Sequence, residues 1–122
     1  MSDATTTLAE LKKWVDDFVD RRDWHQFHAP KNLVMSMAIE AAELMEHFQW
    51  VSAEESRAVV ENPQRMEAVA DELADVLCYG LALANELRLD LSTALRRKMA
   101  KNEQKYPADE YRGRYGPEDS RP

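Results

Sequence analysis

The chain has only three glycines among its 122 residues, and they form no glycine-rich segment. Neither glycine motif that binds phosphates, Gly-x-x-x-x-Gly-Lys or Gly-x-Gly-x-x-Gly, is present. β-Branched residues are few and no stretch alternates like a strand, whereas Ala, Leu, Glu, Met and Arg are abundant. The composition therefore predicts an all-α protein, in which any phosphate is held by side chains and metal.

The chain also lacks the features of exported and membrane proteins. Its single cysteine, Cys78, allows no intrachain disulfide and suits a reducing cytosol. The longest apolar run, around residues 76–84, is far shorter than the ~20 residues of a transmembrane helix. The N-terminus has no basic region followed by an apolar stretch. We expect a cytoplasmic protein with no membrane partner.

Basic residues are outnumbered, with 16 Lys and Arg against 23 Asp and Glu, which gives a net charge of −7. Proteins that bind nucleic acid polymers usually present a basic face to the phosphates, so this class is not expected. A small phosphorylated ligand stays open if a metal ion carries the positive charge.

The pattern of apolar residues predicts four to five helices in one bundle. Capping residues mark the starts of helices at Thr7, Ser52, Asn62 and Asp90. The predicted helices cover residues 8–22, 31–48, a short segment after Ser52, 63–87 and 90–105. The longest helix is expected to bury one face, made of Met66, Val69, Ala70, Leu73, Leu77, Leu81 and Ala84. We assign residues 1–107 to one helical domain and 108–122 to a charged tail, mobile unless a partner subunit orders it.

Two pairs of acids, Glu40 with Glu43 and Glu72 with Asp75, are each spaced by three residues. This spacing places both acids of a pair on the same side of a helix, and each pair lies in or beside an apolar stripe. Buried acids need a counter-charge, and a hard divalent cation is the natural one. Ordinary solvated helix surface is the alternative for acids at this spacing.

The residues around these pairs indicate which metal to expect. The Glu-x-x-His motif of ferritin-like di-iron bundles is missing from both pairs. A ligand set made only of oxygen atoms suits Mg²⁺, with Mn²⁺ as a substitute, and Mg²⁺ usually accompanies phosphate. Lys98, Lys101 and Lys105 share one helix face beside Asn102, and could meet the phosphates. A solvated basic helix end is the other interpretation of this face.

Four segments together resemble the MazG-like, all-α nucleoside triphosphate pyrophosphatases, and among them the dCTP pyrophosphatase branch. They are RDWHQFHAPKNL (22–33), EAAELMEHFQW (40–50), ELADVLCY (72–79) and KMAKNEQKYP (98–107). The resemblance covers residues 8–107. It implies hydrolysis of a (deoxy)nucleoside triphosphate, dCTP or a related nucleotide, between the α and β phosphates. It also implies assembly as a dimer or a dimer of dimers.

The resemblance assigns roles to individual residues. The two acidic motifs of the family fall on Glu40, Glu43, Glu72 and Asp75, which would hold Mg²⁺, and Glu43 is our choice for the general base. The residues aligned with the nucleoside site are Trp24, His28, Trp50 and Tyr79, and the phosphate ligands would be Lys98, Asn102 and Lys105. One position departs from the family: animal members that prefer dCTP have a histidine where this chain has Val15.

Two alternatives remain at this point. A helical module could use the same acids only to bind metal, nucleotide or a protein partner, without turnover. If the protein is an enzyme, the all-α dUTPases and the phosphoribosyl-ATP pyrophosphohydrolases are further alternatives. They share this fold and the same kind of metal site, so only a panel of substrates distinguishes these activities.

Overall fold

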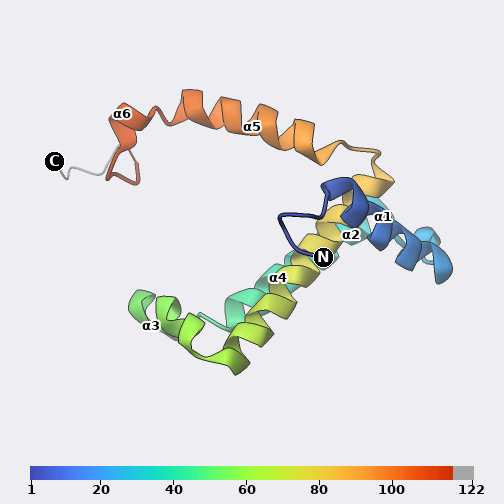
Figure 1. The fold of residues 1–122 in the computed structure, drawn as a ribbon, viewed down its shortest axis with the longest axis horizontal. Helices are drawn as coiled ribbons and strands as arrows, with labels where there is room; N and C mark the ends of the chain where they lie inside the picture. The colour runs from blue at the N-terminus through green and yellow to red at the C-terminus, as the bar shows by residue number, and fades with distance from the viewer. Residues whose placement is uncertain (117–122) are drawn as a thin grey trace. The chain divides into compact units, whose positions relative to one another are not determined.

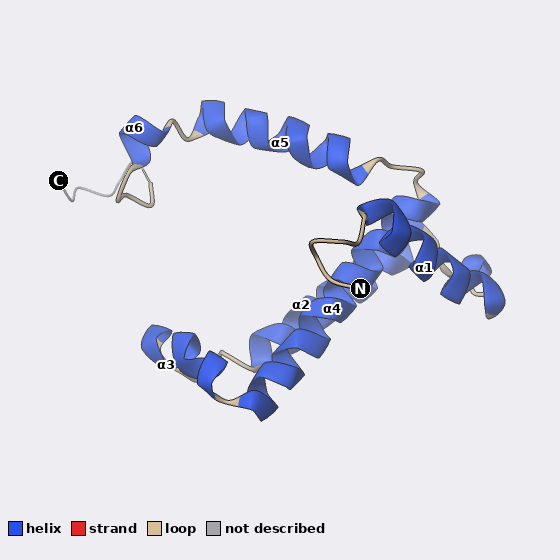
Figure 2. Ribbon diagram, in the orientation of Figure 1, coloured by secondary structure: helices blue, strands red, loops and turns tan. Residues whose placement is uncertain are grey.

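The computed structural model describes residues 1–116, and every regular element in that range is a helix. The chain forms two compact units, Met1–Leu89 and a second that begins at Asp90. Figure 2 shows the helices and the connecting loops. The prediction of an all-α protein is confirmed for this part of the chain.

The first unit contains α1 (Leu8–Arg21), α2 (Pro30–Glu46), α3 (Ala53–Arg57) and α4 (Pro63–Glu86). Two 3₁₀ helices, η1 (His25–Phe27) and η2 (Ala58–Glu61), lie between them. Helices α2 and α4 run side by side over most of their length, and α1 packs on α4 (Figure 1). The guanidinium of Arg65 donates to the His47 carbonyl at 3.0 Å, so the end of α2 meets the start of α4 and the two helices are antiparallel.

Side-chain caps start α1, α3 and α4 where the sequence predicts. Thr7 and Glu10 form a reciprocal capping box at the start of α1. Asn62 accepts a hydrogen bond from the Arg65 amide at 3.1 Å, and Pro63 occupies the first position of α4. Helix α2 begins at Pro30, one residue before the predicted start, because a proline suits the first turn of a helix.

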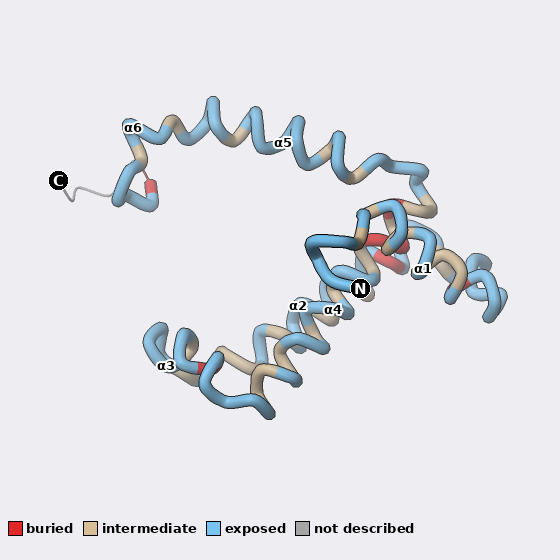
Figure 3. The backbone as a smooth tube through the Cα atoms, viewed as in Figure 1, coloured by how far each residue is buried: buried red, intermediate tan, exposed pale blue. Residues whose placement is uncertain are grey.

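The core lies where α1, α2 and α4 meet (Figure 3). Its buried apolar residues are Val19, Leu33, Leu81, Ala82 and Ala84, and one further buried apolar residue, Val59, lies apart in η2. Leu33 is the largest of them that is almost fully enclosed, at 2% exposure. Two hydrogen bonds link α1 to the end of α4 in the same region. The Asn85 side-chain amide donates to the Lys12 carbonyl at 2.9 Å, and the Lys12 ammonium donates to the Leu89 carbonyl at 2.7 Å.

The predicted core face of α4 is only partly correct. Leu81 and Ala84 are buried, but Leu73 and Leu77 are 56% and 52% exposed, and Ala70 is exposed as well. Helix α2 covers one side of α4, whereas α1 packs near its C-terminal end. Within the first unit, the middle of this helix therefore keeps an uncovered apolar side.

The second unit contains α5 (Leu91–Lys105) and α6 (Ala108–Tyr111). Asp90 caps α5 through the Thr93 amide at 3.3 Å, and the rings of Tyr106 and Tyr111 meet edge to face at 5.3 Å. Helix α6 falls inside the segment for which the sequence predicts a mobile tail. That prediction also covers residues 117–122, which lie outside the described residues.

Candidate functional site

Three carboxylates gather on the paired helices α2 and α4. Glu40 and Glu43 come from one side of α2 and Glu72 comes from α4, and one oxygen of each lies within 4.8 Å of the other two. Because α2 and α4 are antiparallel and adjacent, acids more than 25 residues apart in sequence share one site. The structure therefore brings together three of the four predicted metal ligands.

Two oxygens in this cluster are buried and unpaired. Oε2 of Glu40 and Oε2 of Glu72 have almost no contact with solvent, and neither has a hydrogen-bond partner among the described residues. Such an atom is costly in a folded protein unless something else satisfies it. Two orphaned oxygens in one acidic cluster are the kind of atoms that a cation would satisfy.

Burial and repulsion raise the pKa values of both residues. Loss of water is the largest cause for Glu40, followed by the interaction with the neighbouring Glu43 and the charge of Asp75, which together raise the pKa to about 7. Burial also raises the pKa of Glu72, with the charge of Glu43 as the next cause. Without a cation the cluster thus holds protons at a pH where isolated carboxylates have lost them.

The donor set fits the metal that the sequence predicts. All three clustered ligands are carboxylates, and no histidine or cysteine belongs to the group. Oxygen ligands are those that Mg²⁺ and Mn²⁺ prefer. The orphaned oxygens and the chemistry of the ligands agree with a hard divalent cation.

Asp75 lies beside this cluster, outside the group of oxygens within 4.8 Å. It lines a neighbouring cavity together with Glu40, and its charge contributes to the raised pKa values of Glu40 and Glu72. Asp75 is therefore close enough for its charge to affect Glu40 and Glu72, although its carboxylate lies outside the group formed by the other three.

That cavity, of about 350 Å³, lies between α1, α2, α4 and the segment around η1. Glu40 and Asp75 form its acidic part, and three of the predicted nucleoside residues, Trp24, His28 and Tyr79, form part of its wall. The volume is at the small end of the range for ligand pockets. An acidic cluster thus borders a cavity that has aromatic side chains in its wall.

A family model described as MazG-like family matches residues 35–115, which include the whole acidic cluster. The chain belongs to the MazG-like family. It is 39% identical over 107 residues to dCTP pyrophosphatase 1 of Bos taurus, with 88% of this chain and 63% of that protein covered. For dCTP pyrophosphatase 1 of Homo sapiens the identity is 40% over 102 residues, with 84% and 60% covered. The chain thus spans less than two thirds of these relatives.

A solved structure has the same fold as this MazG-like chain. The crystal structure of a pyrophosphatase from Archaeoglobus fulgidus superposes with a TM-score of 0.77 at 42% identity. The match covers 88% of this chain and 98% of that one. The family resemblance predicted from the sequence motifs is therefore confirmed.

Some predicted site residues of the MazG-like chain lie elsewhere. Trp50 follows the end of α2, is 88% exposed and does not line the cavity. Lys98, Asn102 and Lys105 lie on α5 in the second unit, where Asn102 donates to the Met99 sulfur at 3.7 Å. Their roles in binding the nucleoside and the phosphates stay predictions.

Sequence reasoning missed several residues of the cavity wall. Phe18 and Val19 of α1 and Cys78 of α4 line it together with Val15. Phe18 meets the Trp24 ring edge to face at 5.9 Å, and the Arg22 guanidinium lies 3.6 Å from the centre of the Phe18 ring. Phe18 and Val19 are apolar residues of α1, and only the packing of α1 on α4 shows that they border a cavity.

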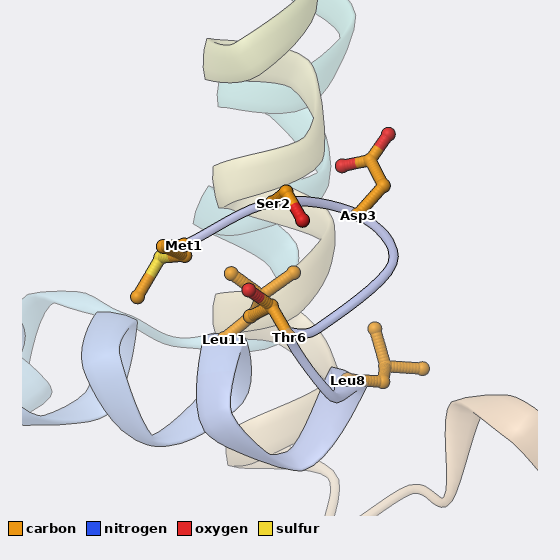
Figure 4. A pocket seen from close by; sticks show the side chains of 6 residues that line it. All are labelled: Met1, Ser2, Asp3, Thr6, Leu8 and Leu11. Carbon is orange, nitrogen blue, oxygen red and sulfur yellow. The ribbon is translucent and has the colours of Figure 1, made fainter.

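A second cavity, of about 410 Å³, lies at the N-terminal segment (Figure 4). Its lining consists of Met1, Ser2, Asp3, Thr6, Leu8 and Leu11. One carboxylate and no aromatic ring belong to it. Because it lacks the paired acids, we assign the functional site to the cavity beside Glu40.

Proposed function

We propose that the protein is a Mg²⁺-dependent nucleoside triphosphate pyrophosphohydrolase, a hydrolase that releases the monophosphate and pyrophosphate from dCTP or related deoxynucleotides. Clearing unwanted nucleotides from the cellular pool is its proposed purpose. The observation that carries the proposal is the pair of orphaned carboxylate oxygens beside a cavity with an aromatic wall. The names of the relatives, dCTP pyrophosphatase 1 and a pyrophosphatase, support the same reaction.

Each acid has a role in this proposal. Glu40 and Glu72 hold the metal through their buried oxygens, and Glu43 and Asp75 complete its surroundings. Bound there, Mg²⁺ would neutralise the triphosphate and orient it for attack by water. We choose Glu43 to accept the proton of the attacking water, because the orphaned buried oxygens belong to Glu40 and Glu72.

The cavity wall binds the nucleoside. Trp24 and Tyr79 both line the cavity, and in this proposal Trp24 stacks on the base while Tyr79, one turn after Asp75 on α4, contacts the sugar. Contact of Tyr79 with the sugar favours deoxyribose over ribose. Lys98, Asn102 and Lys105 remain the proposed phosphate ligands.

The reaction is tested by incubating the protein with each common ribo- and deoxynucleoside triphosphate and with phosphoribosyl-ATP, in Mg²⁺, Mn²⁺ or chelator. We expect monophosphate and pyrophosphate, with deoxynucleotides preferred and no turnover in chelator. Diphosphate and orthophosphate as products would contradict the proposed bond cleavage. Ligand-dependent stabilisation without any product would support the non-catalytic binding module instead.

The preference for the base is tested at Val15, which lines the cavity. Valine has no polar group to offer a base, whereas animal dCTP-preferring members have a histidine at the aligned position. The Val15→His variant should raise kcat/KM for dCTP relative to dTTP, and Val15→Leu serves as the apolar control. An equal change for both nucleotides would show that this position does not discriminate between bases.

The proposal also includes assembly and location. The exposed Leu73 and Leu77 of α4 support association of copies into a dimer or tetramer, because burial of such side chains stabilises an interface. Analytical ultracentrifugation tests this directly. We place the protein in the cytoplasm, which fluorescent tagging in cells would check.

A further inference from the structure

His25, the first residue of η1, is surrounded by carboxylates although it lies outside the acidic cluster. Its Nδ1 is 2.6 Å from Oε1 of Glu86, the last residue of α4. Its Nε2 is 3.5 Å from Asp16 and 3.9 Å from Asp20, both on α1. A neutral imidazole can donate from only one nitrogen, so this arrangement is best satisfied when His25 is protonated.

The same residue adjoins the wall of the cavity. Trp24 directly precedes His25, His28 follows η1, and both line the cavity beside the acids. The other side-chain hydrogen bonds of this described segment remain local in sequence: Gln26 bonds to Asp23, and Asn32 bonds to the Phe27 carbonyl. The His25 to Glu86 contact therefore ties the segment to a helix distant in sequence.

The backbone of the segment has its own constraint. Asp23 has a φ of 53°, in the left-handed region that non-glycine residues seldom adopt. After this turn the Trp24 amide donates to the Val19 carbonyl at 3.1 Å, so the chain folds back against the end of α1. The start of the segment is thus held by the backbone, and the contact of His25 with Glu86 links its continuation to α4.

We propose that His25, held by Glu86 of α4 and flanked by Asp16 and Asp20 of α1, positions the Trp24 to His28 wall and thereby sets the affinity of the cavity for its nucleotide. The inference rests on the proposed function, since it takes a nucleotide as the occupant. His25 is a positioning residue, because it acts through Trp24 and His28 and does not itself line the cavity.

Protonation of His25 makes this contact depend on pH. The hydrogen bond with Glu86 raises the pKa of His25 most, burial lowers it, and the charges of Glu86, Asp16 and Asp20 raise it further. The charged contact is complete below the ordinary histidine pKa of 6.5 and is lost as pH rises through the raised value. Nucleotide affinity should therefore weaken on the alkaline side of that value.

The test compares Glu86→Gln and His25→Gln with Asp17→Asn, a control that removes an exposed α1 carboxylate paired with Lys13 at 2.8 Å. The NMR resonance of the Trp24 indole N–H, assigned with the Trp24→Phe variant, measures the environment of this part of the cavity wall and requires no catalysis. We expect this resonance to shift in both test variants and to stay fixed in the control. In the test variants KM should rise about fivefold, with kcat within about twofold of wild type. The KM of the test variants should also change less between pH 6 and pH 9 than the KM of wild type.

Binding of the non-hydrolysable α,β-methylene dCTP with Mg²⁺, followed by the Trp24 resonance, measures affinity independently of catalysis. If wild type binds this analogue but hydrolyses no nucleotide, the proposed reaction fails and the positioning role is judged from the dissociation constants. Test variants that match the control in both resonance and affinity would overturn the inference. A shifted resonance with unchanged affinity would overturn the link to the nucleotide, as would a fall in kcat alone.

Discussion

Binding of Mg²⁺ to the acidic cluster should release protons, because Glu40 holds one close to neutral pH. The pKa of Glu40 is raised to about 7 by burial, by the interaction with the neighbouring Glu43 and by the charge of Asp75. A carboxylate must be ionised to bind a cation, so a proton held by Glu40 is displaced when the metal arrives. With a pKa near 7, Glu40 carries about 0.8 proton at pH 6.5 and about 0.1 at pH 8. The raised pKa of Glu72 adds to this release in the same direction.

Isothermal titration calorimetry measures the effect. Repeating the Mg²⁺ titration in buffers of different ionisation enthalpy gives the number of protons released per ion. We expect close to one proton at pH 6.5 and few at pH 8 for wild type. Because Glu40→Gln has no proton to lose at this position, most of the release should disappear, whereas Asp17→Asn should behave as wild type. Equal release at both pH values, or no change in Glu40→Gln, would refute the assignment.

The same shift has a consequence for stability without metal. A carboxyl with a raised pKa in the folded state prefers its protonated form there. Its contribution to stability is present below the ordinary value of 4.5 and is lost as pH rises through about 7. In chelator, the melting temperature should therefore fall across this window, and Glu40→Gln should show a weaker fall. A melting temperature in chelator that rises with pH over the same range would contradict the raised pKa of Glu40.

Three further predictions concern turnover, the core and a helix cap. Glu72→Gln should lower turnover by at least about 100-fold with unchanged circular dichroism. The control Glu67→Gln, which changes an exposed acid on the same helix, should keep its activity. Equal activity in the two variants would show that Glu72 is not part of the site. Leu33→Ala should reduce the free energy of unfolding by about 2–5 kcal/mol in urea denaturation, and a loss below ~1 kcal/mol would show that the site is not tightly packed. Asn62→Ala should cost about 1 kcal/mol in the same assay by removing the hydrogen bond to the Arg65 amide, and an unchanged midpoint would show that this cap contributes nothing.

Local features of the fold were predictable from the sequence. The starts of α1, α4 and α5 follow from Thr7, Asn62 and Asp90, whose side chains accept backbone hydrogen bonds three residues ahead. Caps depend on adjacent residues only, so the sequence is sufficient to locate them. The same holds for the shared side of Glu40 and Glu43, which the helix period determines.

Features that depend on how helices meet were not predictable in this way. The 3₁₀ turn at His25–Phe27 is held by Glu86, 61 residues away. The same limit explains Leu73 and Leu77: periodicity identifies an apolar side of α4, but it does not say which part another helix covers. The position of Asp75 outside the group of three carboxylates likewise depends on the packing of α2 against α4.

The ligands of the proposed cation come from two helices that the chain joins through residues 47–62. Because an ion held by Glu40 and Glu72 would bind only when these two helices are packed together, it would stabilise the folded chain over the unfolded one. Resistance of α3 and its flanking turns to a protease should then follow the Mg²⁺ concentration, so that the supply of the ion sets the lifetime of the folded molecule as well as its rate of turnover.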